Sequence, residues 1–232
     1  SNRSVERAIG ILLLVCQSKS TMGLTEISRE AHLDKATALR LLTSLVNSNF
    51  LKQDPDSRRY SRGAGVYGIW SDAVSRLARP HLEELSKISQ ETSCLIVPRG
   101  KSTRILVDAV HPDRELQVVA QVGQIKPIYS GASGAVLMAF RPVEDAEQIL
   151  KNVDLEAFTH ETLTNKEKYL TRLIEVRDQG YTWLHGEVKS GISTIAAPIL
   201  DKQDEVVGSV VLRGPDIRMN DKTIRELVPH VL

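Results

Sequence analysis

Residues 24–46 read LTEISREAHLDKATALRLLTSLV, and this stretch decides the fold of the first part of the chain. Thr25 is a candidate cap for a short helix that carries Ile27 and Ala31 one turn apart. Asp34 is a candidate cap for a second helix, in which leucines recur at helical spacing. The few residues between the two leave room only for a tight turn. The stretch therefore predicts two consecutive helices joined by that turn.

The segments on either side complete this unit. Before it, residues 4–16 carry apolar side chains at helical spacing and predict a first helix, capped by Ser4. After it, two short runs at residues 50–53 and 58–61 flank the turn Asp-Pro-Asp-Ser and predict a hairpin. Three helices followed by a hairpin within residues 3–63 form the arrangement called a winged helix-turn-helix.

The charges are distributed unevenly along the 232 residues. Residues 1–63 contain ten Lys and Arg against six acids, a net charge of +4, whereas the remainder contains 20 against 23, a net charge of −3. A small basic unit joined to a larger, slightly acidic one is typical of a protein that binds nucleic acid at one end only.

Composition excludes several other classes of protein. Hydrophobic residues make up 41% and charged residues 25% of the chain, which is typical of globular proteins. No apolar run approaches the roughly 20 residues that cross a bilayer, so we expect a cytoplasmic protein without a membrane partner. Cys16 and Cys94 have no further cysteine or histidine at metal-ligand spacing, so we expect no disulfide framework, metal site or cofactor.

The rest of the chain predicts an α+β domain. Residues 64–79 read as a linker helix, and Pro80 starts a new helix at the beginning of a domain that runs from 80 to 232. Strands are predicted at 94–97, 104–110, 115–120, 181–184, 192–200 and 206–213, with helices between the two groups and after Asn220. Hairpin connections within each group predict a mainly antiparallel sheet.

Short motifs along nearly the whole chain are similar to one known family, and their joint occurrence in order is specific. They are SVERAIGIL at 4–12, GLTEIS at 23–28, LDKAT at 33–37, RLL at 40–42, FL at 50–51, DPD at 54–56, RPHLEEL at 79–85, RDQGY at 177–181, IAAP at 195–198 and GP at 214–215. The chain resembles the IclR family of bacterial transcriptional regulators. This resemblance implies a winged-helix DNA-binding domain, a linker helix, a GAF-like effector-binding domain, and assembly as a homodimer or homotetramer on operator DNA.

The resemblance also implies where DNA is bound. The helix capped by Asp34 is the one that enters the major groove, and we expect Leu39, Leu42 and Leu45 to pack inward. The expected DNA contacts are Lys35, Thr37, Ala38 and Arg40 on this helix, and Arg58 and Arg59 in the wing. The family frequently has proline and serine where this chain has Asp34 and Ala36, so an operator sequence does not carry over.

For the effector, the resemblance implies a cavity beside a loop of small residues. The expected contacts are Ser130, Gly131, Ala132 and Ser133 in this loop, and Leu184, Thr194, Val211 and Arg213 on strands. Our hypothesis is a ligand with an apolar or aromatic body and a carboxylate that pairs with Arg213. The alternative is that Arg213 lies in solvent or in a structural ion pair.

Two other classes of function remain open at this point. An enzyme would need the pocket around Ser133, but the G-x-S-x-G spacing of a nucleophile elbow is absent, and the sequence ties no histidine or acid to this serine. We therefore expect no catalysis. An architectural DNA-binding oligomer whose large domain binds no ligand is the other alternative. The sequence does not distinguish a repressor from an activator.

Overall fold

The computed structural model describes residues 3–18 and 20–232. The chain consists of two compact units, Ser1–Ala73 and Val74–Leu232. Each of them has hydrophobic core clusters of its own. The division falls inside helix α4 (Ala64–Ser89), which begins in the first unit and ends in the second.

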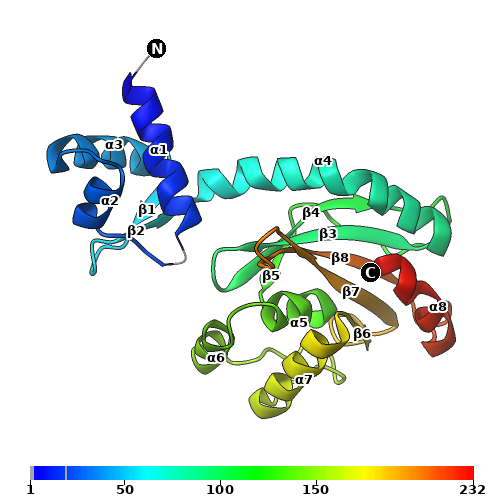
Figure 1. Cartoon of the computed structure of the whole chain (residues 1–232). Coiled ribbons are helices and arrows are strands. Elements are labelled where there is room, and N and C mark those ends of the chain that lie inside the picture. Colours follow the sequence, from blue (N-terminus) through cyan, green and yellow to red (C-terminus); the bar gives the residue numbers. More distant parts are fainter. Residues whose placement is uncertain (1–2, 19) are drawn as a thin grey trace. The chain divides into compact units, whose positions relative to one another are not determined.

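The first unit contains helices α1 (Arg3–Gln17), α2 (Leu24–Glu30) and α3 (Lys35–Asn47), followed by strands β1 (Leu51–Gln53) and β2 (Tyr60–Arg62) (Figure 1). The two strands pair antiparallel with Leu51 opposite Arg62. Ile11, Ile27 and Leu42 bring the three helices together in one core, which Tyr60 of the hairpin completes. The predicted winged helix-turn-helix arrangement is therefore confirmed.

The helix caps of this unit agree with the sequence at Asp34 and differ at Ser4 and Thr25. Ser4 lies inside α1, which begins at Arg3. Asp34 caps α3 as predicted, since its side chain accepts a hydrogen bond of 2.8 Å from the backbone N–H of Thr37. Thr25 does not cap α2, because the helix begins earlier and Gly23 is its N-cap. The backbone N–H of Gly23 donates to the Glu26 carboxylate at 3.3 Å, so a residue of the first helical turn stabilises the start of the helix.

The inward face of α3 differs from the prediction at Leu39, which is 46% exposed. Ala38, Leu41, Leu42 and Leu45 form the buried face instead. Successive residues of a helix are rotated by about 100°, so the four buried residues lie within about 100° of one another, and Leu39 lies roughly 110° from the middle of that face. Its apolar character suggested an inward position, and the geometry of the helix places it outside.

Helix α4 passes through Pro80 without interruption, so the predicted break between a linker helix and a new helix is wrong. Contacts on both sides of the proline explain why. Before it, Arg79 donates to Asp108 at 2.9 Å. After it, Leu82 and Leu85 are buried in the core of the second unit. These contacts offset the hydrogen bond that a proline removes from a helix.

The second unit is built on a six-stranded antiparallel sheet with the strand order β5-β4-β3-β8-β7-β6. Its strands are β3 (Thr92–Arg99), β4 (Thr103–Val110), β5 (Ile125–Pro127), β6 (Thr182–His185), β7 (Ile192–Leu200) and β8 (Val206–Pro215). The helices are α5 (Gly131–Ala139), α6 (Val143–Lys151), α7 (Lys166–Gln179) and α8 (Asp221–Val231). The predicted α+β class with a mainly antiparallel sheet is confirmed.

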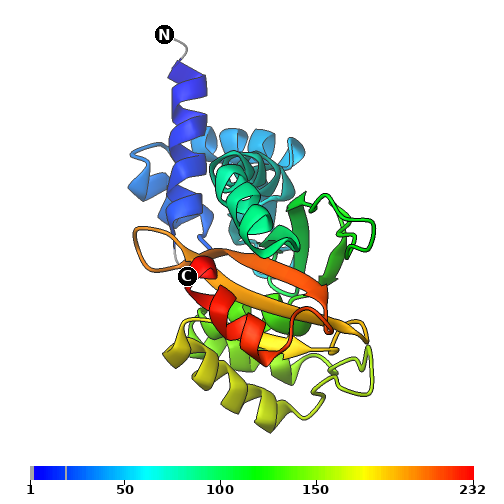
Figure 2. The same cartoon turned by 90° about the vertical axis from the view of Figure 1, so that its right-hand side faces the viewer.

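Helices cover both faces of this sheet. Helices α5, α6 and α7 pack on the face that contains Cys94, Ala196 and Val211. Helix α8 and the last turns of α4 pack on the opposite face (Figures 1 and 2). The sheet therefore presents one face to α5, α6 and α7.

One further prediction for this unit is wrong. Residues 115–120 form irregular structure, and the strand that pairs with β4 lies further on, at β5. Helix α7 is capped by Asn165, whose side chain accepts from the N–H of Lys168 at 2.9 Å. Among the described residues, no helix has both the length and the hydropathy of a membrane span.

Candidate nucleic-acid interface and ligand cavity

The outward side of α3 carries exposed residues at helical spacing. They are Lys35, Ala36, Leu39, Arg40 and Thr43, and we refer to them as the α3 outer face. Two of them are cationic, and a helix that enters the major groove reads bases with such outward side chains. The sequence named Lys35 and Arg40 but missed the other three, although positions 36, 39, 40 and 43 follow the i, i+3, i+4 rule.

The other two residues predicted on this helix are less accessible. Ala38 is fully buried in the core of the first unit, so its predicted contact with DNA is wrong. Its place in the first turn suggested exposure, but the same turn has to supply one residue to the core. Thr37 is half-buried. Hydrogen bonds from its N–H and its hydroxyl lower the pKa of Asp34, so a carboxylate stands at the start of α3.

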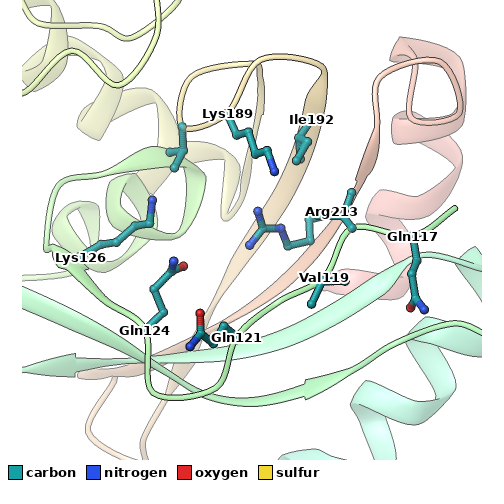
Figure 3. A pocket seen from close by; sticks show the side chains of 10 residues that line it. Gln117, Val119, Gln121, Gln124, Lys126, Lys189, Ile192 and Arg213 are labelled. Atoms are coloured by element: carbon teal, nitrogen blue, oxygen red, sulfur yellow. The ribbon is translucent and has the colours of Figure 1, made fainter.

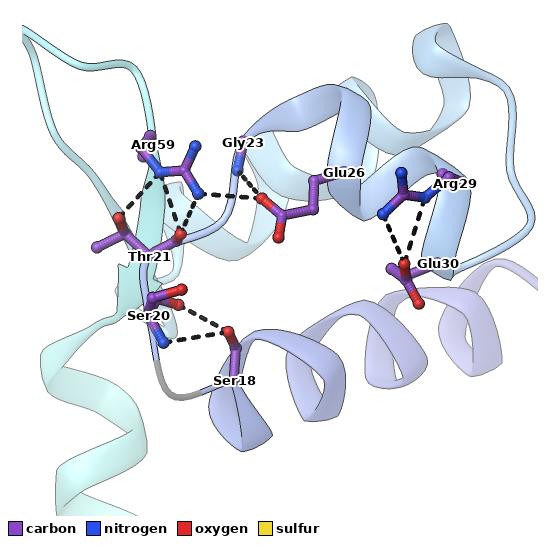
Figure 4. Close-up of polar contacts among 8 residues, drawn as sticks. All are labelled: Ser18, Ser20, Thr21, Gly23, Glu26, Arg29, Glu30 and Arg59. Atoms are coloured by element: carbon purple, nitrogen blue, oxygen red, sulfur yellow. Dashed lines mark hydrogen bonds and ion pairs between the residues drawn. The ribbon is translucent and has the colours of Figure 1, made fainter.

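The two wing arginines have different surroundings. Arg58 is exposed in the turn between β1 and β2, where its backbone adopts a positive φ of 56°. Arg59 reaches back to the segment before α2 (Figure 4): its Nε donates to the carbonyl of Thr21 at 3.0 Å, and its Nη2 donates to Glu26 at 3.0 Å. Arg59 therefore ties the wing to α2, and Arg58 is the one of these two arginines that is available to a partner.

The second unit contains a cavity of about 440 Å³. Three segments enclose it: residues 117–126 between β4 and the end of β5, the loop between β6 and β7, and the end of β8. Its lining consists of Gln117, Val118, Val119, Gln121, Gln124, Lys126, Val188, Lys189, Ile192 and Arg213. Figure 3 shows the guanidinium of Arg213 in the middle of this cavity, with the ammonium groups of Lys126 and Lys189 directed into it.

A smaller hollow of about 20 Å³, room for roughly one water, adjoins the cavity and shares Val188, Lys189, Ile192 and Arg213 with it. Five of the eight predicted effector contacts line this hollow, namely Gly131, Ala132, Leu184, Thr194 and Arg213. The structure therefore brings together residues from α5, β6, β7 and β8, as the resemblance implied.

The other three predicted contacts lie beneath the cavity. Val211 is buried in the core under α5, and Ser133 is buried within α5, so the structure places neither of them in the lining of the cavity or of the hollow. Ser130 is also buried and accepts a hydrogen bond of 3.0 Å from Arg104. The reason is the same for all three: they have the expected position along the chain, but their side chains fill the layer between sheet and helix.

Arg213 occupies the middle of the sheet, paired with Thr92 of β3 on one side and Thr194 of β7 on the other. Its Nε is buried and has no hydrogen-bond partner among the described residues. Among the described residues, Arg213 therefore does not form the structural ion pair that was the alternative to a ligand contact. The guanidinium instead faces the cavity.

Sequence reasoning missed a buried arginine on the same face of the sheet as Arg213. Arg104 on β4 is only 6% exposed, and its Nη2 donates to the carbonyl of Ser130 at 2.8 Å, while its Nε has no partner among the described residues. Burial, and next the positive charge of Arg213, lowers the pKa of Arg104 to about 10. An arginine on the inward-facing side of an apolar strand is the signal that could have revealed it.

Neither Ser133, which is buried, nor Ser193 has the geometry of a nucleophile. Ser193 lies beside His185, with 2.7 Å between Oγ and Nδ1, and His185 Nε2 lies 2.9 Å from Asp221. However, Ser193 is fully buried and donates its proton to Asp216 at 2.5 Å, so the histidine does not activate it. The network instead joins β6, β7 and the start of α8.

The first unit is a winged helix-turn-helix with cations on its outward helix, and the second is an α+β domain with a ligand-sized cavity. These features define the class of DNA-binding regulators that carry a sensor domain. Residues 4–55 match the IclR helix-turn-helix domain, and residues 69–232 match the bacterial transcriptional regulator IclR C-terminal domain. The chain therefore belongs to the IclR family of transcriptional regulators.

Curated relatives include the HTH-type transcriptional regulator KdgR of Escherichia coli, 27% identical over 97% of this chain and 87% of that protein. The glycerol operon regulatory protein of Streptomyces coelicolor is 32% identical over 91% of this chain and 84% of its own length. A solved IclR regulator from Alicyclobacillus acidocaldarius is 27% identical with a TM-score of 0.65, covering 100% of this chain and 95% of that one. The curated relatives are named as regulators, so the chain is a DNA-binding regulator with an effector-binding domain and not an enzyme.

Proposed function

We propose that a small carboxylate with an apolar or aromatic body controls DNA binding by this regulator, and that its carboxylate pairs with Arg213. The observation that carries the proposal is the buried Nε of Arg213, which has no partner among the described residues. A buried donor without an acceptor costs about 1–3 kcal/mol, and a carboxylate would supply acceptors in a fork that matches a guanidinium. The apolar side chains of Val119, Val188 and Ile192 line the cavity and can contact the apolar body of such a ligand.

On the DNA side, the proposal is that Arg40 and Lys35 contact bases or phosphates of the operator in the major groove. Arg40 has the planar fork that suits guanine, and each good bidentate pair discriminates by about 1–3 kcal/mol. The half-buried Thr37 and the exposed Arg58 are the further proposed contacts. Among the predicted cationic contacts, Arg59 is the weakest candidate, because its charge is compensated by Glu26.

Control by the effector requires that the ligand binds two states of the protein with different affinity. Helix α4 is the segment of chain that connects the two units, so a change of state has to involve it. We propose that this occurs in a homodimer or homotetramer in the cytoplasm of a bacterium.

The test is binding of the full-length protein to DNA from upstream of its own gene and of the neighbouring gene. It is measured over a salt series with a panel of aromatic and aliphatic carboxylates. We expect sequence-selective binding that weakens steeply with salt and shifts with one of the acids. Arg213→Ala should abolish the response to the acid while leaving DNA binding intact, whereas Arg225→Ala on the exposed side of α8 is the matched control. Selective DNA binding that no acid alters would favour the architectural alternative.

A further inference from the structure

Cations outnumber acids around the cavity. Lys126, Lys189 and Arg213 line it, and Arg104 lies just beneath it on the same face of the sheet. Arg104 and Lys126 are direct cross-strand partners on β4 and β5. Like charges in directly opposite positions of an antiparallel pair are destabilising. The arrangement is costly for the protein unless something negative compensates it.

The acids of this region do not compensate these charges. Among the described residues that line the cavity and the adjoining hollow, the one acid is Glu187. Arg172 already occupies both of its carboxylate oxygens, at 2.7 and 3.0 Å. Glu156 favours the charged form of Lys126 only weakly, behind burial and the repulsion from Arg104 and Arg213, and the pKa of Lys126 is lowered overall. One monocarboxylate would therefore leave most of the positive charge uncompensated.

Two of the lining cations lie on strands and form separate anchor points, whereas Lys189 lies on the loop between β6 and β7. Arg213 approaches from the middle of the sheet, and Lys126 approaches from its edge strand (Figure 3). Lys126 is held in place, because its Nζ lies 5.2 Å from the centre of the Phe158 ring. The amide of Gln124 points into the space between the two, where it can donate or accept a hydrogen bond.

We infer that the effector is a small dianion, with one negative group on Arg213 and a second on Lys126. This inference rests on the proposed function, because it assigns a second charge to the ligand of the same cavity. The shared chemistry is a pair of negative charges on a compact body, as in a dicarboxylate or in a phosphate monoester. A neutral or singly charged ligand fits the apolar walls but leaves the cross-strand pair of cations without a counter-charge.

The experiment compares matched ligands by calorimetric titration of the full-length protein. Phthalate is compared with benzoate, and adipate with hexanoate, so that within each pair the body is kept and one charge is added. Phenyl phosphate forms the third arm and distinguishes a phosphate ester from a dicarboxylate. We expect at least one dianion to bind about tenfold more tightly than its monoanionic partner, the gain of one charge-assisted hydrogen bond. The preference should shrink as salt is added.

Two variants assign the charges to their anchors. Lys126→Gln should reduce the preference for the dianion to less than about threefold while the monoanion binds as before. Arg213→Gln should weaken both members of a pair. Lys202→Gln is the matched control, since Lys202 is an exposed lysine in the turn between β7 and β8, remote from the lining residues. Unfolding curves of the variants show whether each is folded.

The outcomes separate this inference from the function on which it rests. If monoanions bind as tightly as their dianionic partners, or if Lys126→Gln leaves the preference unchanged, the second charge is refuted and the carboxylate effector stands. If no acid of any arm binds and DNA binding responds to none of them, the proposed function fails together with this inference.

Discussion

The two surfaces of this protein present their cations in opposite ways. On the α3 outer face, Arg40 and Lys35 lie in water, where an unpaired charge costs almost nothing. In the cavity of the second unit, Arg213 and Arg104 each bury an Nε without a partner among the described residues. The exposed cations therefore reveal little about their partner, since any anion suffices. The buried ones are informative, because their cost implies a ligand that compensates it.

Removing Arg40 is the change for which we expect the largest effect. Arg40→Ala should weaken binding to the selected DNA about 10- to 100-fold, because a bidentate contact to a base is lost. Its stability should stay within about 0.5 kcal/mol of wild type, since the side chain is exposed. Titration of labelled DNA measures the first quantity and urea unfolding the second. Unchanged DNA affinity in Arg40→Ala would show that the α3 outer face is not the reading surface.

Replacing Arg213 should stabilise the protein. Arg213→Met removes an unpaired charge from the cavity, so the ligand-free protein should become more stable by about 1–2 kcal/mol. Arg40→Met is the matched exposed control and should leave the free energy of unfolding unchanged. Urea unfolding without any ligand makes the comparison. A destabilised Arg213→Met protein would mean that the guanidinium is satisfied in the free state, and the contrast between the two surfaces would collapse.

The two cysteines differ in burial, and we expect this difference to appear in how the stability of the protein depends on pH. Burial raises the pKa of Cys94 to about 12, against an ordinary value of 9.0. Between these two values the unfolded thiol loses its proton while the native thiol keeps it, so stability should fall as the pH rises above about 9. The slope should approach about 1.4 kcal/mol per pH unit.

Urea unfolding at several pH values from 8 to 10.5 tests this expectation. Cys94→Ala should lack the contribution, and the difference between the two proteins isolates it from other groups. Cys16, which is only half-buried, is the control, because Cys16→Ala should keep most of the slope. Equal pH dependence in wild type and Cys94→Ala would contradict the assignment.

The smallest effect is expected in the wing. A double-mutant cycle on Arg59 and Glu26 should give a coupling of about 0.5 kcal/mol, because both side chains are partly exposed. Arg58→Ala should leave stability unchanged and weaken DNA binding about threefold, with a shallower dependence on salt. Should Arg59→Ala weaken DNA binding without affecting stability, the roles of the two arginines would have to be exchanged.

Local patterns were sufficient for most of the fold. Helical spacing, the Asp34 cap and the turn between two short strands predicted the winged helix-turn-helix, and hairpin connections between the later strands predicted the antiparallel sheet. The failures occur where tertiary contacts outweigh a local rule. Helix α4 continues through Pro80 because Arg79 and Leu82 are held against the sheet, and residues 115–120 stay irregular although their composition suits a strand.

For the sites, the sequence by itself determined the class of protein. It also identified five of the eight predicted effector contacts that line the hollow beside the cavity. Only the tertiary structure decided which of them are accessible. It buried Ala38, Ser133 and Val211, and it placed Arg104 opposite Lys126. The physical reason is that a side chain's chemistry belongs to the sequence, whereas its burial and its neighbours depend on pairing between strands far apart along the chain. The charge balance of the cavity arises from that pairing.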